Sequence, residues 1–279
     1  MNNQPLSSGI VLHNFIIPAP GVPKTVLYHF SDIHLTVFDA LSDDAEREQA
    51  IQGSSRWNQT RRYFAEKNGE PLETAQQLDA AAHLSRLLHL SEAGDALILA
   101  GDIFDCVSPA NLRALESALQ NHPTPVLFVC GNHEDPAQIP EDLCFSSVKN
   151  PVQILDLPGL ILVGLDNSRR CITAEQTAQL QALLAGDKPL IIAMHIPIMA
   201  DSNRALLEPC GEYFRLNHSE ADRETLRFVE LVQRNPGKIL AVLAGHLHFS
   251  CTSELAPGIS QYVSSQGILG NINRYEIGE

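Results

Sequence analysis

Short apolar segments recur along the chain, and each is rich in valine, isoleucine and leucine. They lie at residues 24–30, 95–100, 125–130, 160–166, 189–195 and 238–244. Continuous apolar runs of this length are typical of strands that are buried on both faces. Three later segments, FSCTSEL, ISQYVSS and NRYEIG, alternate between apolar and polar residues, with breaks at Pro257-Gly258 and Gly267. We expect these three to form an antiparallel C-terminal meander.

Between the apolar segments, the apolar residues recur at helical spacing. The predicted helices cover residues 72–94, 108–120, 173–186 and 219–237, and the second begins with Ser108 as N-cap and Pro109 in its first turn. Strands that alternate with helices indicate an α/β protein. Residues 36–71 and 199–218 fit this alternation poorly. Since no linker composition divides the chain, we predict a single domain over 1–279, with a cap or insertion at 36–71 and a substrate-side loop at 199–218.

Polar residues that can bind metal ions follow five of the apolar strands. In chain order they are Asp32 and His34, Asp102 and Asp105, Asn132 and His133, His195, and His246 and His248. In open α/β sheets, sites form at the carboxyl ends of strands. Any one of these motifs alone is common as a turn or as a hydrogen-bonded histidine. Burying all of them without partners would cost about 1–3 kcal/mol per unsatisfied group, so together they predict a metal site.

Composition and charge narrow the class of protein. The formal net charge is −14 over 279 residues, which argues against loose binding to nucleic acid polymers or to anionic membranes. A small phosphorylated substrate stays compatible, because metal ions can supply positive charge. No apolar run reaches the ~18 residues of a membrane span, and the first 20 residues lack a signal-peptide pattern, so we expect a cytoplasmic protein with reduced cysteines. Nothing in the sequence indicates an oligomeric state.

The motifs Asp-x-His, Gly-Asp-x-x-Asp, Gly-Asn-His-Glu, His and Gly-His-x-His occur in this order from Asp32 to His248. Together they resemble the calcineurin-like metallophosphoesterases. The resemblance implies an α/β fold, a four-layer α/β/β/α sandwich of two mixed sheets with flanking helices. It also implies a site for two metal ions. In that arrangement one ion takes Asp32, His34 and His248, the other takes Asn132, His195 and His246, and Asp102 bridges them.

The chemistry expected from this resemblance is hydrolysis of a phosphoester. Mixed Asp, His and Asn ligation suits Mn, Fe, Zn or Ni. Two divalent or trivalent ions can clamp a phosphate and generate the attacking hydroxide at neutral pH. His133 would stabilise the transition state or protonate the leaving oxygen. Asp105 would orient His133 or a ligand, although a cap or turn role for the helix at 108–120 is an equal alternative.

For the substrate, we favour a small, nucleotide-like phosphodiester. Arg56, Trp57 and Arg61 follow the Asp-x-His loop and are candidates to bind it, and Asn203 and Arg204 follow His195 closely. The alternative for the first group is a solvated amphipathic helix with one packed tryptophan. A phosphomonoesterase or protein phosphatase is a second reading of the motifs. A non-catalytic metal-binding scaffold is a third, and another metal hydrolase, such as an amidohydrolase with an early His-x-His, is a fourth.

Overall fold

Two mixed six-stranded sheets form the centre of the protein in the computed structural model, which describes residues 2–5, 9–67 and 78–278. In spatial order the first sheet contains β1 (Asn2–Pro5), β2 (Val11–Pro18), β12 (Asn271–Gly278), β3 (Thr25–Phe30), β4 (Ala96–Ala100) and β5 (Val126–Val129). The second contains β10 (Cys251–Ala256), β11 (Ile259–Val263), β9 (Ile239–Ala244), β8 (Leu190–Ala193), β7 (Leu160–Leu165) and β6 (Val152–Leu157). All six apolar runs predicted to be strands are strands.

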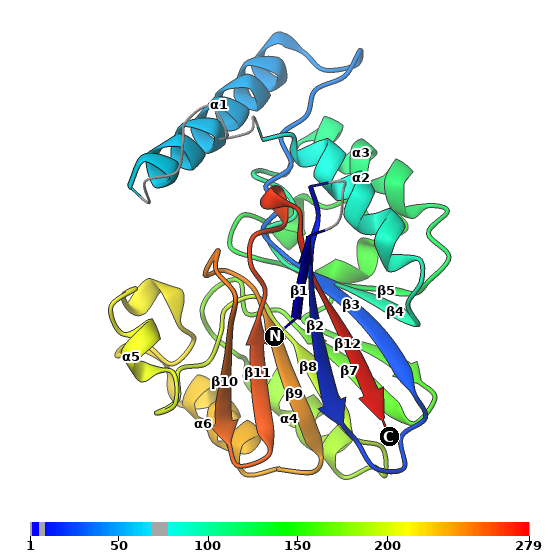
Figure 1. Cartoon of the computed structure of the whole chain (residues 1–279), viewed down its shortest axis with the longest axis vertical. Helices are drawn as coiled ribbons and strands as arrows, with labels where there is room; N and C mark the ends of the chain where they lie inside the picture. Colours follow the sequence, from blue (N-terminus) through cyan, green and yellow to red (C-terminus); the bar gives the residue numbers. More distant parts are fainter. Residues whose placement is uncertain (1, 6–8, 68–77, 279) are drawn as a thin grey trace.

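The central strands of each sheet are parallel, so their carboxyl ends lie at a common edge. In the first sheet, β3, β4 and β5 run parallel, and in the second, β7, β8, β9 and β11 do. Antiparallel pairs are added in the second sheet by β6 against β7 and by β10 against β11, and the second of these pairs is labelled in Figure 1. This arrangement brings together the loops that follow β3, β4, β5, β8 and β9, which carry the candidate metal ligands.

Helices α2 and α3 cover the outer face of the first sheet, and α4 and α6 cover that of the second. The longer ones are α1 (Asp44–Lys67), α2 (Ala80–Ser91), α3 (Pro109–Leu119), α4 (Ala174–Leu184) and α6 (Arg223–Gln233). Shorter turns are α5 (Arg204–Leu207), η2 (Pro136–Gln138), η3 (Ser146–Lys149), η4 (Glu212–Phe214) and η5 (Gly267–Leu269). As predicted, Ser108 caps α3, and its side chain accepts a hydrogen bond from Asn111 N. None of the helices in the described ranges is both long and apolar enough to cross a membrane.

Alternate residues of a central strand enter different apolar layers. On β4, Leu97 and Leu99 pack with the cluster that includes side chains of α2 and α3, whereas Ile98 packs with the cluster between the sheets. A third cluster joins the second sheet to α4 and α6, where Phe228 is fully buried. The order of layers is therefore helices, sheet, sheet, helices, which confirms the predicted α/β/β/α sandwich.

The expected C-terminal meander is wrong. The strands β10 and β11 do form an antiparallel pair, but β11 is parallel to β9. The last strand, β12, lies in the other sheet, between β2 and β3. Its side chains explain this position, because Tyr275 and Ile277 are buried between the two sheets.

Most of segment 36–71 is the helix α1, which projects from the body of the molecule (Figure 1). Segment 199–218 contains α5 and η4. The predicted helix at 72–94 begins within residues 72–77, which lie outside the described residues, and its described part is α2.

Candidate metal centre

Backbone hydrogen bonds join four of the ligand-bearing loops in two pairs. Asp32 N donates to Gly101 O at 3.0 Å, and His34 N donates to Asp102 O at 3.0 Å. Gly245 N donates to His195 O at 2.9 Å. The loops after β3 and β4 are thus joined within the first sheet, and those after β8 and β9 within the second.

The backbone at the candidate ligands is held in the left-handed region. Among the described residues, six that are not glycine have a positive φ. Five of the six are candidate ligands: Asp32, His34, Asp102, His246 and His248. Such a conformation is uncommon for non-glycine residues and clusters at functional sites. The strand-end turns therefore aim these side chains at the cost of local strain.

Asp32, His34 and His248 form one group of candidate ligands. His34 Nε2 lies 3.1 Å from His248 Nε2, and His248 Nε2 lies 3.2 Å from Asp32 Oδ1. Asp32 Oδ1 has no hydrogen-bond donor, although it is buried. Burial alone would raise the pKa of Asp32, but the neighbouring His248 holds this pKa well below its usual range. A buried anion facing two imidazole nitrogens fits a cation.

Asp102, Asn132, His195 and His246 surround a second position. His195 Nδ1 donates to Ala100 O at 2.7 Å, so its Nε2 faces Asp102 Oδ2 at 3.3 Å and Asn132 Oδ1 at 3.2 Å. Asp102, His195 and His246 each offer an atom within 4.8 Å of the others. Burial alone would lower the pKa of His195, but the Asp102 carboxylate beside it raises this pKa to about 10. The oxygens of Asp102 and Asn132 that face His195 would also attract a cation.

The tautomer of His246 is set by the segment 199–218. His246 Nε2 donates to the backbone oxygen of Tyr213 at 3.2 Å, which leaves Nδ1 for the second position. Burial lowers the pKa of His246 to about 4 and that of His34 to about 3. Both imidazoles are therefore neutral at pH 7, as metal ligands must be. The seven candidate ligands fit two cations, with Asp102 near both groups.

His133 and Asp105 lie together beside this centre. His133 Nδ1 donates to the backbone oxygen of Asp105 at 2.8 Å, and it lies 3.7 Å from the Asp105 carboxylate. The His133 ring lies 4.8 Å from the His34 ring, and 33% of its side chain is exposed. Because Ser108 caps α3, the side chain of Asp105 does not have that task. The Asp105 carboxylate binds α1 instead.

Helix α1 is attached to the centre through Asp105. Arg56 Nη2 donates to Asp105 Oδ2 at 2.5 Å, and Trp57 Nε1 donates to Asp105 Oδ1 at 3.0 Å. The Trp57 ring stacks on the His34 ring, with centroids 4.0 Å apart and 26° between the planes. Gly53 permits this docking, because a Cβ there would lie 2.8 Å from Asp105 Oδ2.

The other predicted substrate residues lie in different surroundings. Arg61 lines a cavity next to the centre. The Asn203 amide is buried, and it bonds Ala200 N, Ile198 O and Ser253 Oγ, which gives it a structural task in its turn. Arg204 forms an exposed ion pair with Asp201, which lies in the turn before α5. Binding of substrate by Asn203 and Arg204 stays a prediction.

Two residues that support the ligand loops were not identified as such from the sequence. Glu134 is buried and accepts hydrogen bonds from the backbone N–H groups of Asp102, Phe104 and Gly131. Asn167 accepts from the backbone nitrogens of His195 and Ile196. Glu134 could have been found from the sequence, because it is the last residue of the Gly-Asn-His-Glu motif. No sequence pattern marks Asn167, because its role depends on the approach of β7 to β8.

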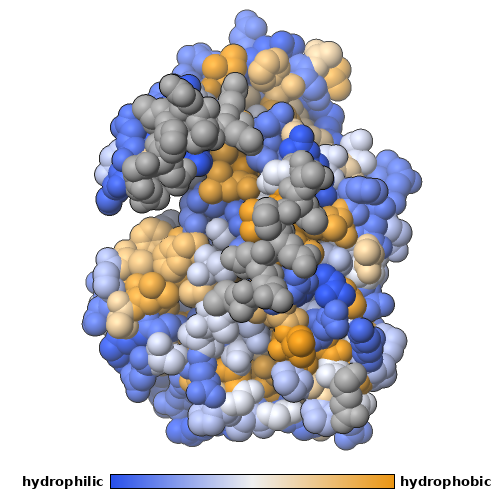
Figure 2. Space-filling model, viewed as in Figure 1, coloured by the Kyte–Doolittle hydropathy of each residue, from blue (hydrophilic) through white to orange (hydrophobic). Residues whose placement is uncertain are grey.

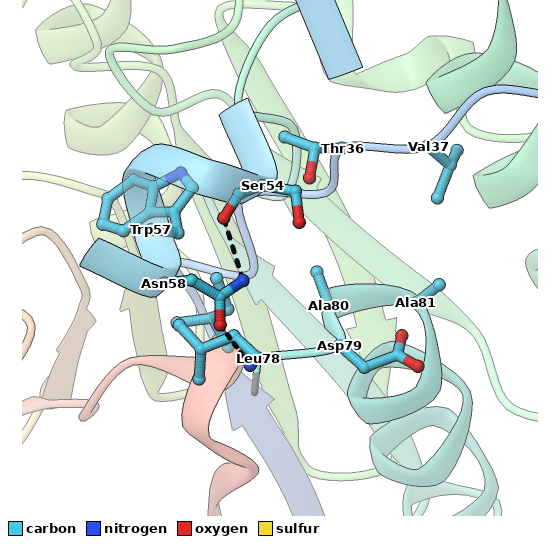
Figure 3. A pocket seen from close by; sticks show the side chains of 10 residues that line it. Thr36, Val37, Ser54, Trp57, Asn58, Leu78, Asp79, Ala80 and Ala81 are labelled. Carbon is cyan, nitrogen blue, oxygen red and sulfur yellow. Dashed lines mark hydrogen bonds between the residues drawn. The ribbon is translucent and has the colours of Figure 1, made fainter. Parts of the chain in front are cut away.

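A cavity of about 420 Å³ lies between α1 and the start of α2, and Trp57 and Leu78 lie at its edge. Figure 3 shows Asn58 of α1 bridging this edge. Its amide donates to Ser54 O at 2.9 Å and accepts from Leu78 N at 2.8 Å. The amide thus links α1 to the segment that leads into α2.

Comparisons with known proteins agree with this geometry. Residues 25–250 match the model of the calcineurin-like phosphoesterase family. The chain is 30% identical over 178 residues to the glycerophosphodiester phosphodiesterase GpdQ of Enterobacter lignolyticus, a match that covers 59% of this chain and 60% of that protein. It is 28% identical over 259 residues to a probable cyclic nucleotide phosphodiesterase of Rhodococcus erythropolis, covering 87% of this chain and 71% of the relative. A dimetal phosphatase from Danio rerio shares the fold, with a TM-score of 0.54, 12% identity and 88% of each chain covered.

Proposed function

The chain belongs to the calcineurin-like phosphoesterase family and is a metal-dependent phosphoester hydrolase, and from this premise we propose that it hydrolyses small, nucleotide-like phosphodiesters at a dinuclear metal centre. The observation that carries the proposal is the convergence of ligand atoms on two adjoining positions. One position is bounded by Asp32, His34 and His248, and the other by Asn132, His195 and His246. Asp102 belongs to candidate groups on both sides and would hold both ions.

When bound, two ions of Mn, Fe, Zn or Ni would polarise the phosphate and supply a nucleophile from water at neutral pH. The protein's own contribution begins with orientation. His195 and His246 each donate one ring N–H to a backbone oxygen, so the other ring nitrogen is presented to the centre. No cysteine belongs to the ligand groups, and this donor set does not select among the four metals.

His133 is the proposed proton donor to the leaving oxygen. Its Nδ1 is committed to the backbone oxygen of Asp105, so Nε2 exchanges the proton. The ring is partly exposed, as a group that meets substrate must be. The preference for diesters over monoesters is supported by the two curated relatives, whose names describe phosphodiesterases.

The test is reconstitution of metal-stripped protein with Mn²⁺, followed by hydrolysis of bis-p-nitrophenyl phosphate and of p-nitrophenyl phosphate. Asp102→Asn should lose metal, measured by elemental analysis, together with activity. His133→Ala should keep its metal and lose about 10²- to 10⁴-fold in kcat, as expected for loss of a general acid. His89→Ala is the matched control, since His89 is an exposed histidine on α2.

Each outcome decides one part of the proposal. Faster turnover of the diester supports a phosphodiesterase, whereas faster turnover of the monoester favours a phosphomonoesterase. Stoichiometric metal binding without turnover of either compound would favour a metal-binding scaffold. Absence of metal binding would refute the dinuclear centre.

A further inference from the structure

A cavity of about 590 Å³ opens beside the metal centre. Its walls are largely apolar and aromatic, and include Trp57, Phe214, Leu247, Phe249 and Leu269. His246 and His248, one from each group of candidate ligands, also line it. The cavity is therefore continuous with the place where the phosphate would bind.

One wall belongs to α1, and its tryptophan is fixed in place. The indole N–H is bound to Asp105, and the ring is stacked on His34 on one face. The ring also lies 5.6 Å from the His248 ring. Arg56 binds the same carboxylate, so two neighbouring residues of α1 donate hydrogen bonds to Asp105. The orientation of the indole is thus set before any ligand arrives, which lowers the entropic cost of binding.

Another wall belongs to η4 in segment 199–218. The Phe214 ring lies 5.1 Å from the His246 ring, and the backbone oxygen of Tyr213 accepts from that histidine. Arg170 stabilises η4 by two contacts. Its guanidinium donates a hydrogen bond to Glu212 O at 3.1 Å and lies over the Tyr213 ring. Figure 2 shows a hollow in the surface between α1 and the apolar area around α5.

We propose that this cavity is the recognition subsite for a flat aromatic group, such as a nucleobase, on an ester of the substrate, and that Trp57 is its specificity-determining residue. The inference rests on the proposed phosphodiesterase function. The aromatic side chains Trp57, Phe214 and Phe249 line this cavity, and aromatic rings stack on nucleobases. A small polyol such as glycerol would leave these apolar walls in contact with water.

Trp57 is the only tryptophan of the chain, so its emission reports occupancy of the cavity. The probes are adenosine 5′-monophosphate and glycerol 3-phosphate, titrated into Mn²⁺-loaded protein and followed by fluorescence and by calorimetry. We expect the nucleotide to bind more tightly and to change the emission. In Trp57→Ala, calorimetry should show a loss of about tenfold to a hundredfold for the nucleotide and less than about twofold for glycerol 3-phosphate.

Two further variants separate recognition from a general effect on the fold. Trp57→Phe keeps a ring but loses the bond to Asp105, so it should recover part of the affinity for the nucleotide. Ile51→Ala changes an exposed residue of the same helix and should bind both probes like the wild type. Equal losses for both probes in Trp57→Ala would overturn the proposal, because Trp57 would then act through His34 and the metal centre.

Failure of this inference is distinct from failure of the proposed function. Hydrolysis of 3′,5′-cyclic AMP and of glycerophosphoethanolamine is measured on the wild type in parallel. If neither is hydrolysed while the nucleotide still binds through Trp57, the phosphodiesterase proposal fails and the subsite stands. If both are hydrolysed with equal kcat/KM and the two probes bind equally, the subsite is refuted and the enzyme stands.

Discussion

Replacing Gly53 with alanine tests whether α1 is seated on the loops of the metal centre. An alanine Cβ at this position would lie 2.7 Å from Thr36 Cγ2 and 2.8 Å from Asp105 Oδ2. Ordinary van der Waals contact begins at about 3.4 Å, so the helix would have to move outward by about 0.7 Å. That movement would pull on both Asp105 bonds of α1 and shift Trp57 against His34.

Two opposing contributions determine the change in stability. Alanine favours a helix over glycine by about 1 kcal/mol, whereas overpacking costs about 1–3 kcal/mol. We therefore expect Gly53→Ala to be between neutral and about 2 kcal/mol less stable in urea unfolding. Because a misplacement near 1 Å can lower a rate about 100-fold, kcat/KM for bis-p-nitrophenyl phosphate should fall by at least about tenfold.

The matched control is Ser55→Ala, two residues further along α1 and exposed to solvent. It should gain a few tenths of a kcal/mol from helix propensity and keep its kinetics. The reasoning is refuted if Gly53→Ala is about 1 kcal/mol more stable than the wild type with unchanged kcat/KM. In that case α1 would not be docked on Asp105 in solution.

Three other predictions concern the stability of the protein and the binding of metal. Glu134→Gln should destabilise the protein by about 1–3 kcal/mol in urea, because one amide oxygen cannot accept from all three backbone donors; a change below about 0.5 kcal/mol would contradict this role. The hydrogen bond from Arg113 lowers the pKa of Asp39 to about 2, so this pair stabilises the fold fully above about pH 4 and loses its effect as the pH falls through 2. Unfolding measured from pH 5 to 2 should therefore lose stability less steeply in Asp39→Asn, and identical slopes would exclude the pair as a contributor. Removal of metal by a chelator should change the emission of Trp57, which stacks on His34, and unchanged emission after complete loss of metal would argue against His34 as a ligand.

The strand ends of the site were predictable from the sequence because two local signals coincide there. Apolar runs such as 95–100 and 238–244 indicate buried strands, and Asp102 or His246 then follows directly. Which strands share a sheet was not predictable. The alternating C-terminal segments were correctly predicted to be strands, but their pairing was not. The pairing of β12 with β2 and β3 depends on contacts that span more than 240 residues.

The walls of the cavity show the same limit. Helix α1 has a polar sequence without a continuous apolar stripe, so periodicity alone gave little reason to place it against the body. Its contact depends on Gly53, Arg56 and Trp57 meeting one carboxylate that comes from a different loop. The structural task of Asn203 was likewise hidden, because its three hydrogen bonds arise only when the turn after β8 closes.

The position of β12 also determines when the centre can be assembled during synthesis. Residues 271–278 fill the gap between β2 and β3, after every ligand-bearing loop has already been made. Before residues 271–278 are made, β3 can pair only with β4. The loop that carries Asp32 and His34 then follows an edge strand of an incomplete sheet. Pairing across such a separation is slow to form. Complete assembly of the candidate metal centre is therefore expected only after β12 has been made.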